Sequence, residues 1–214
     1  MSSPASTVFI VDDDDSFRAS VVRLLRASGI PSKAYASARE FLAERPANAP
    51  GCLLTDLRMP AMSGIELQEA LARSDNPVPI VFLTGHGDIP TTVSAMRNGA
   101  EDFLTKNAPK KELLGAVQRA LERDRTERRR RTRTRELQDR FGRLTPRESE
   151  VLNHVLRGQL NKQIAADLGI DERSVKRHRT NLMGKLQIQS VAELSHLAHK
   201  AGMIPSSQTT GVGP

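Results

Sequence analysis

Short apolar runs and amphipathic stretches alternate along the first half of the chain. The apolar runs read as strands over residues 8–11, 33–36, 52–55, 80–84 and 102–105. The stretches between them carry apolar residues at helical spacing, as at Phe17, Val21 and Leu25, and cover about 16–27, 39–44, 64–73 and 90–98. No hairpin dipeptide joins neighbouring runs. The pattern predicts an α/β fold: a doubly wound, five-stranded parallel sheet with helices on both faces.

The apolar pattern stops after a fifth helix. That helix begins near Lys110, its apolar face ends at Leu121, and no apolar residue then occurs before Leu137. Such a segment cannot bury a face, so we expect either a solvated helical linker or a partly disordered one. The predicted organisation is a first domain at 1–122, a basic helical linker at 123–143, a second domain at 144–202 and a disordered tail at 203–214.

The second domain is expected to contain four helices and no strand. Thr145 and Glu148 form a capping box around Pro146, which is a strong signal for a helix start. A short helix over 161–168 ends at Gly169, a third helix covers 172–186, and a fourth covers 191–199. Two helices joined through a glycine turn predict a helix-turn-helix, whose second helix reads the DNA major groove.

The third helix of this domain carries a cationic stripe. Arg173, Lys176, Arg177 and Thr180 fall at i, i+3, i+4 and i+7 and therefore share one face. Such a stripe is most often a solvated surface. The preceding helix-turn pattern and the basic charge of the region favour a binding surface here.

Charge is distributed unevenly along the chain. The net charge of +7 consists of −1 in residues 1–121, +5 in 122–143 and +3 in 144–214. A basic second half favours an anionic partner, but charge alone leaves nucleic acid and membrane open. A single cysteine excludes an intramolecular disulfide and a Cys-rich zinc site. Because no apolar run reaches ~18 residues and no export signal is present, we expect a cytoplasmic protein with no membrane partner.

Polar residues follow four of the predicted strands. Asp12 and Asp13 come after the first strand, Asp56 after the third, Thr84 at the end of the fourth and Lys106 after the fifth. With the strand order 2-1-3-4-5, the first and third strands are neighbours, so the carboxylates would meet in the crevice at the carboxyl ends. Three carboxylates, a hydroxyl and an amine suit a hard cation such as Mg²⁺ together with a phosphoryl group.

These residues lie in the segments VDDDDSFR, LLTDLRMPAMSGIEL, IVFLTGHGD and AEDFLTK. Together the segments resemble the receiver domain of two-component response regulators, over residues 5 to about 122. The resemblance implies that Asp56 is the phosphoacceptor and attacks the phosphohistidine of a sensor histidine kinase. It also implies that Asp13, Asp56 and the backbone carbonyl of Arg58 hold Mg²⁺ or Mn²⁺, with Asp12 acting through a water. Lys106 would bind the phosphoryl group.

A conformational switch is also implied by the resemblance. Thr84 would turn to hydrogen-bond a phosphoryl oxygen on Asp56, and Phe103 would rotate into the space vacated. Asp14 and Asp15 match no ligand of the family, so we expect them to be solvated at the start of the first helix, where negative charge is mildly favourable.

Asn107 marks a departure from the family pattern. The family commonly has a proline after the site lysine, often with a cis peptide bond, whereas here the next proline is Pro109. A cis bond between Lys106 and Asn107 would cost ~2.5–4 kcal/mol. We therefore expect a trans bond or a strained loop.

The segments LTPRESEVL, NKQIAADLGI and SVKRHRTNLMGKL resemble the LuxR/NarL-type DNA-binding domain over residues 144–199. By this resemblance Lys176, Arg177 and Thr180 face the base edges of double-stranded DNA. Residues expected to reach phosphates are Lys162, Ser174, Arg179, Asn181 and Lys185, with Arg173 beside them on the exposed stripe. The two resemblances together point to the FixJ-like group of response regulators.

The expected function is phosphorylation-controlled transcriptional regulation, not enzymatic turnover. The receiver would catalyse only its own phosphoryl transfer and slow dephosphorylation. Phosphorylation of Asp56 would drive homodimerisation, or release of the second domain, and then promoter binding. RNA polymerase is a further expected partner.

Two alternatives remain open from the residues. The segment DDDDS also fits the nucleophile motif of haloacid-dehalogenase-type phosphatases, with Asp12 attacking and Asp14 as general acid. The acidic pair that should close a later strand in those enzymes is missing after Lys106, which disfavours this reading. The other alternative is a phosphorylation-independent transcription factor that uses the receiver only to dimerise. The complete set of site residues argues against it.

Overall fold

The computed structural model describes residues 5–46, 48–74, 76–85 and 89–203, and the chain forms two compact units, 1–128 and 129–214. The division falls inside the expected linker, so the first unit extends beyond the expected domain end at residue 122. Of the tail expected at 203–214, residues 204–214 lie outside the described part of the chain.

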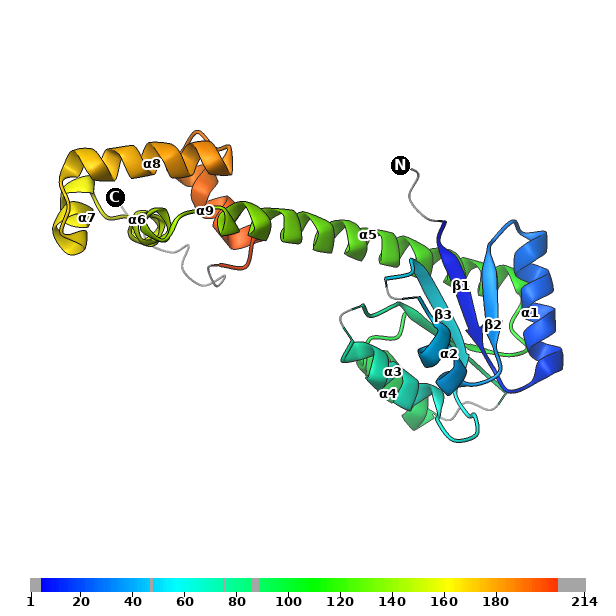
Figure 1. Cartoon of the computed structure of the whole chain (residues 1–214). Helices are drawn as coiled ribbons and strands as arrows, with labels where there is room; N and C mark the ends of the chain where they lie inside the picture. Colours follow the sequence, from blue (N-terminus) through cyan, green and yellow to red (C-terminus); the bar gives the residue numbers. More distant parts are fainter. Residues whose placement is uncertain (1–4, 47, 75, 86–88, 204–214) are drawn as a thin grey trace. The chain divides into compact units, whose positions relative to one another are not determined.

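A parallel sheet forms the centre of the first unit (Figure 1). Its strands are β1 (Thr7–Val11), β2 (Ser32–Tyr35), β3 (Gly51–Asp56), β4 (Ile80–Thr84) and β5 (Asp102–Thr105). They lie in the order β2-β1-β3-β4-β5, which confirms the predicted topology. The register pairs Val11 with Thr55 and Asp56 with Leu83. The carboxyl ends of β1, β3 and β4 are therefore neighbours.

Both faces of the sheet are covered by helices. The helices of this unit are α1 (Asp15–Ala27), α2 (Ala38–Glu44), α3 (Gly64–Ala72), α4 (Ile89–Arg97) and the first part of α5 (Lys110–Gly142). Because successive strand residues point to opposite faces, Phe9 and Val11 pack in one core with α2, α3 and α4. Val8 and Ile10 pack in the other core with α1 and α5. The predicted α/β class is confirmed.

Cys52 lies in the second of these cores and is fully buried in β3. Burial raises the pKa of its thiol to about 12. The side chain therefore packs as a small apolar group and not as a reactive thiolate.

Helix α5 is a single helix of 33 residues. Its first turns bury Leu113 and Val117 against the sheet, and its last turns bury Leu137 and Phe141 in the core of the second unit. The segment between them is helical, which was one of the two expected forms. The segment was expected to bury no face, and it does bury one polar side chain, that of Asp124, which is only 2% exposed. This segment therefore contacts the rest of the first unit through polar side chains and not through apolar ones.

The second unit contains α6 (Pro146–Leu156), α7 (Asn161–Leu168), α8 (Glu172–Leu186) and α9 (Val191–Lys200). The capping box forms as expected, with the Thr145 hydroxyl accepting from the Glu148 N–H at 3.3 Å and the Glu148 carboxylate accepting from the Thr145 N–H at 2.8 Å. Gly169 ends α7 with a left-handed φ of 64°, and Asp171 caps α8. These signals produce the predicted helix-turn-helix. None of the helices in the described part of the chain has the length and apolarity that a bilayer crossing requires.

Candidate functional site

Three carboxylates meet at the carboxyl ends of β1 and β3. Asp12 and Asp13 follow β1 directly, and Asp56 is the last residue of β3. Since Val11 and Thr55 are register partners, the residues that follow them lie side by side. One carboxylate oxygen from each of the three residues lies within 4.8 Å of the others. The structure therefore brings together the acidic residues that the sequence placed at these strand ends.

Lys106 completes the cluster from the far side of β4. Its backbone N–H donates to the carbonyl of Thr84 at 2.8 Å, which fixes the start of the loop after β5. Its Nζ lies 2.7 Å from Asp56 Oδ2 and 2.8 Å from Asp12 Oδ2. Burial alone would lower the pKa of Lys106, but hydrogen bonds to Asp12 and Asp56 outweigh burial and raise it. Lys106 therefore remains cationic at the phosphoacceptor candidate.

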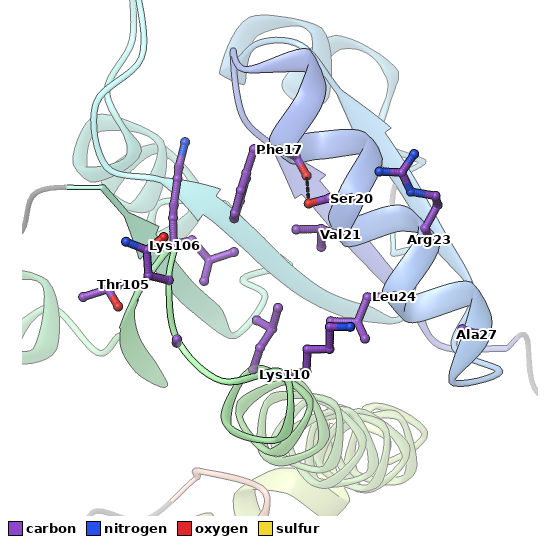
Figure 2. A pocket seen from close by; sticks show the side chains of 13 residues that line it. Phe17, Ser20, Val21, Arg23, Leu24, Ala27, Thr105, Lys106 and Lys110 are labelled. Atoms are coloured by element: carbon purple, nitrogen blue, oxygen red, sulfur yellow. Dashed lines mark hydrogen bonds between the residues drawn. The ribbon is translucent and has the colours of Figure 1, made fainter.

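Asn107 does not misdirect the lysine. No cis peptide bond occurs among the described residues, so the Lys106–Asn107 bond is trans, one of the two outcomes we expected. The Lys106 ammonium also lies 4.7 Å from the centre of the Phe17 ring on α1, a cation–π distance. Figure 2 shows the two side chains next to each other. Two carboxylates and one aromatic ring thus position the lysine without the proline.

A pocket of about 520 Å³ lies behind Lys106, between α1 and the start of α5 (Figure 2). Its lining includes Phe17, Leu24 and Leu113, together with the side chain of Lys106. Lys106 therefore contributes both to the lining of this pocket and to the acidic cluster.

The three carboxylates of the acidic cluster carry more negative charge than the Lys106 ammonium neutralises. Asp12 is 1% exposed and Asp56 8% exposed, whereas Asp13 is open to solvent. Burial raises the pKa of Asp12, although hydrogen bonds from Lys106 and from the Asp14 N–H oppose this. Asp12 Oδ2 lies at ion-pair distance from Lys106 yet accepts no hydrogen bond of normal geometry. Three carboxylate ligands facing one amine fit a hard divalent cation.

The loop after β3 is built around Asp56. A Cβ atom on Gly64 would lie 2.3 Å from the Asp56 carbonyl oxygen, so only glycine allows α3 to start this close to the strand end. The backbone N–H of Arg58 donates to Asp56 Oδ1 at 3.2 Å, while its side chain lies at the surface. The sequence pointed to the Arg58 carbonyl as a metal ligand, but gave no sign that the Arg58 N–H orients Asp56.

The two expected switch residues lie on β4 and β5, beside the cluster. Thr84 is 2% exposed and follows Leu83, the register partner of Asp56. Phe103 is half-buried, and its ring centre lies 6.0 Å from that of Phe82. Thr84 thus ends the strand next to that of the phosphoacceptor candidate, and Phe103 lies one strand further, on β5.

Asp14 and Asp15 are exposed and lie outside the cluster, as expected. Asp14 caps α1, since its Oδ1 accepts from the N–H groups of Ser16 and Phe17 at 2.9 and 3.1 Å. Asp15 pairs with Arg18 one turn later. The carboxylate that the phosphatase alternative needs as general acid is therefore occupied as a helix cap.

The predicted DNA-contacting residues separate into two groups on the second unit. The first group is exposed on one side of α8, opposite the buried side chains of that helix, and consists of Arg173, Lys176, Arg177 and Thr180. Asn181 on α8 and Lys162 on α7 are also exposed. In the first group, Lys176 Nζ lies 3.5 Å from Glu172 at the surface, and the Thr180 hydroxyl donates to the Lys176 carbonyl at 3.1 Å. In the second group the side chains contact residues outside α8. Arg179 donates to Asn161 at 2.7 Å, and Lys185 pairs with the buried Glu148 at 2.6 Å. Ser174 donates to Asp171 at 2.6 Å.

A second ionic cluster, which the sequence did not reveal, lies at the opposite, amino-terminal edge of the sheet. Asp124 on α5 accepts from the Gly51 N–H at 2.8 Å and from Arg128 Nε at 2.8 and 2.9 Å. The Arg128 guanidinium also donates to the carbonyls of Asn48 and Ala49 and to Asn76 Oδ1, at 2.9, 2.6 and 3.2 Å. The only sequence signal was an Asp and an Arg four residues apart within a basic run.

Fold and sites together define a receiver with an acidic site, joined to a helix-turn-helix unit. A family model described as response regulator receiver domain matches residues 8–118, and one described as bacterial regulatory proteins, luxR family, matches residues 143–198. Nodulation protein W of Bradyrhizobium diazoefficiens is 43% identical over 201 residues, covering 94% of this chain and 88% of that protein. The transcriptional regulatory protein FixJ of Rhizobium meliloti is 39% identical over 200 residues, covering 94% and 98%.

Solved structures agree with these relatives. The response regulator StyR matches with a TM-score of 0.79 at 48% identity, covering 92% of this chain and 99% of that one. Full-length FixJ from B. japonicum matches with a TM-score of 0.56 at 34% identity, covering 94% and 98%. The chain therefore belongs to the two-component response regulators that carry a luxR-family DNA-binding domain. It is a phosphorylation-controlled DNA-binding transcriptional regulator and not a classical enzyme, and a histidine kinase and DNA are its implied partners.

Proposed function

We propose that Asp56 is the phosphoacceptor and that Asp12, Asp13 and Asp56, with the backbone carbonyl of Arg58, hold Mg²⁺ or Mn²⁺. The observation that carries the proposal is the placement of Asp56 within hydrogen-bond reach of the Lys106 ammonium and within 4.8 Å of two further carboxylates. When bound, the cation would neutralise charge on the transferring phosphoryl group.

The chain's own residues perform the transfer. A carboxylate oxygen of Asp56 attacks the phosphorus of a phosphohistidine, the P–N bond breaks, and an aspartyl phosphate forms while the histidine nitrogen leaves with the bonding electrons. The Arg58 N–H, 3.2 Å from Asp56 Oδ1, orients the nucleophile. Lys106 exchanges a carboxylate contact for a phosphoryl oxygen. The receiver would thus catalyse its own phosphorylation and slow dephosphorylation.

The phosphorylated site would act on β4 and β5. Thr84 would hydrogen-bond the phosphoryl group, and Phe103 would repack in response. We propose that the surface formed by the helices that follow β4 and β5, α4 and the start of α5, then supports a homodimer, or that the second unit is released. In a dimer, two reading helices on paired half-sites raise DNA affinity through effective concentration.

The exposed stripe on α8 is the proposed base-reading surface, with Lys176, Arg177 and Thr180 at base edges. Phosphate contacts are assigned to Lys162 and Asn181 and, after exchange of their present partners, to Ser174, Arg179 and Lys185, with Arg173 beside them on the exposed stripe. RNA polymerase is the proposed further partner, and the cytoplasm the proposed location. The proposed domains remain 1–122 and 144–202, joined by a helical linker at 123–143 and followed by a disordered tail at 203–214.

Intact mass after incubation with acetyl phosphate and Mg²⁺ tests the phosphoacceptor. Wild type and Asp14→Asn should each gain one phosphoryl group, because Asp14 only caps α1 and asparagine caps equally well. Asp56→Asn should gain none. A full phosphoryl group on Asp56→Asn would assign the acceptor to another residue.

A further inference from the structure

A run of arginines without acidic partners lies on α5 just after the first unit ends. Residues 129–135 have the sequence RRRTRTR, so five of seven side chains are cationic and none is acidic. Arg131 is half-buried, and the other four arginines are exposed. Within the described part of the chain, no ion pair is formed by any of the five. We call residues 129–135 the arginine segment.

Earlier arginines of the same helix do have acidic partners. Arg119 pairs with Asp102 at 2.5 Å, and Arg123 with Glu101 at 2.9 Å. Arg128 makes five hydrogen bonds, two of them to Asp124, and is therefore fully used inside the first unit. The lack of partners begins at the next residue, so it is a local property of the arginine segment.

Spacing within the segment places like charges next to each other. Residues three or four apart are neighbours on a helix surface, so Arg129 lies beside Arg133 and Arg131 beside Arg135. Like-charge pairs of this kind destabilise an isolated helix. Cations also point in several directions around the helix axis, which is unlike the one-sided stripe of α8. An extended polyanion that can reach several of these side chains at once would relieve the repulsion.

The arginine segment is fixed within the DNA-binding unit. It belongs to the compact unit 129–214, and the next turns of α5 bury Leu137 and Phe141 in the same core as α6, α7, α8 and α9. The Gln138 side chain also donates to the carbonyl of Ala201 at 3.2 Å. The polyanion that this unit binds is DNA, whose backbone carries one negative charge per ~1.7 Å of duplex.

We propose that the arginine segment contacts the phosphate backbone of the DNA duplex outside the base pairs read by α8, without reading sequence. Arginine suits this role because its guanidinium can donate two hydrogen bonds to one phosphate. The proposal rests on DNA binding by the helix-turn-helix. It assigns to α5 a share of the affinity for DNA and of the dependence of that affinity on salt concentration.

The test compares two triple variants of equal charge change on the same helix. Arg129→Gln/Arg130→Gln/Arg133→Gln removes part of the arginine segment, and Lys110→Gln/Lys111→Gln/Arg125→Gln removes three cations from the first unit. Binding of each to a random-sequence duplex is measured by fluorescence anisotropy over a range of salt. Circular dichroism and the fluorescence of Tyr35, the only tyrosine in a chain without tryptophan, establish that both variants are folded.

The expected result is a shallower salt dependence for the first variant only. Each lost phosphate contact reduces the slope of log K against log salt by about 0.9, so three contacts reduce it by roughly two to three. An unchanged slope with wild-type affinity overturns the proposal. Binding of the same variants to phosphatidylserine vesicles is measured in parallel. If the first variant loses binding to the vesicles while its DNA binding is unchanged, the proposal is overturned and the segment is assigned to a membrane surface. If wild type itself fails to bind the duplex, the underlying DNA-binding function fails first, and the proposal falls with it.

Discussion

The receiver sheet carries an ionic cluster at each end, and the two are constructed in opposite ways. At the carboxyl end, Asp12, Asp13 and Asp56 face one ammonium, that of Lys106, and Asp12 Oδ2 accepts no hydrogen bond of normal geometry. At the amino end, the Asp124 carboxylate pairs with the Arg128 guanidinium at 2.8 Å. Every nitrogen of the Arg128 guanidinium donates a hydrogen bond there.

The difference distinguishes a ligand-binding site from an ion pair that only stabilises the fold. A buried charge that is paired and fully hydrogen-bonded fixes the elements around it, here α5 and the loops before β3 and β4. A cluster with excess negative charge is costly by itself and becomes favourable when a cation and a phosphoryl group arrive. Burial alone would not separate the two, since Asp12 and Asp124 are almost equally buried.

The largest expected effect comes from breaking the amino-end cluster. Asp124→Asn should destabilise the receiver by about 3 kcal/mol, because it leaves the partly buried Arg128 guanidinium without its counter-charge. Urea unfolding followed by Tyr35 fluorescence measures this in the full chain, since Tyr35 is buried in the receiver core.

Asp56→Asn is the matched control at the other end. It should leave stability unchanged or raise it in the absence of metal, because it removes repulsion among carboxylates. Equal losses for the two variants would mean that both clusters are structural.

The next effect is a Mg²⁺-dependent gain in stability. Ligand binding to the folded state alone stabilises by about 2.7 kcal/mol at a concentration of 100 times Kd. We expect Mg²⁺ to raise the urea midpoint of wild type and of Asp124→Asn, but not that of Asp13→Asn. A full Mg²⁺ shift in Asp13→Asn would place the cation elsewhere.

An ion pair in the second unit, between the buried Glu148 and the exposed Lys185, should behave like the amino-end cluster. Burial opposes ionisation of Glu148, but hydrogen bonds from Lys185 and Thr145 outweigh it and hold the pKa of Glu148 below its usual value of 4.5. Because the folded-state pKa is the lower one, this stabilisation is complete above about pH 4.5 and disappears as pH falls through the folded-state pKa.

Lys185→Met should therefore cost about 2 kcal/mol near neutral pH and less in acid. Thermal unfolding followed by circular dichroism, at a series of pH values, measures this loss of stability. A pH-independent loss would mean that Lys185 acts through packing. DNA binding at low salt then shows whether Lys185 also reaches phosphate, as proposed above.

The smallest effect concerns Cys52, which follows Gly51 and therefore adjoins the amino-end cluster. Its buried thiol, with a pKa raised to about 12, should not react with iodoacetamide in native wild type. Asp124→Asn should react faster because unfolding becomes more frequent, whereas Asp56→Asn should not. Rapid labelling of native wild type would show that β3 opens locally.

Much of the receiver site was predictable because strand ends are visible in sequence. Asp12, Asp13 and Asp56 each adjoin an apolar run, and the strand order that brings them together follows from the βα alternation. The capping residues Thr145, Asp171 and the turn at Gly169 were equally local signals. Each of these predictions concerned neighbours in sequence or strands in a standard order.

Contacts between distant residues could not be predicted in this way. Asp124 lies 73 residues from Gly51, and Arg128 lies 80 residues from Asn48. Neither is apolar, so hydropathy indicated only a solvated linker there. The ion pair of Lys185 was likewise not visible in the sequence, because its buried partner Glu148 lies on a different helix. Long polar side chains form such contacts without leaving a periodic pattern.

Sedimentation velocity of one sample, before and after acetyl phosphate and Mg²⁺, tests the central claim that Asp56 controls assembly. Intact mass on the same sample reports the extent of phosphorylation. We expect a shift from monomer to dimer that follows the fraction phosphorylated, and no shift for Asp56→Asn. A fully phosphorylated wild type that sediments unchanged and binds DNA no more tightly would contradict it, as would a dimer that forms equally in Asp56→Asn.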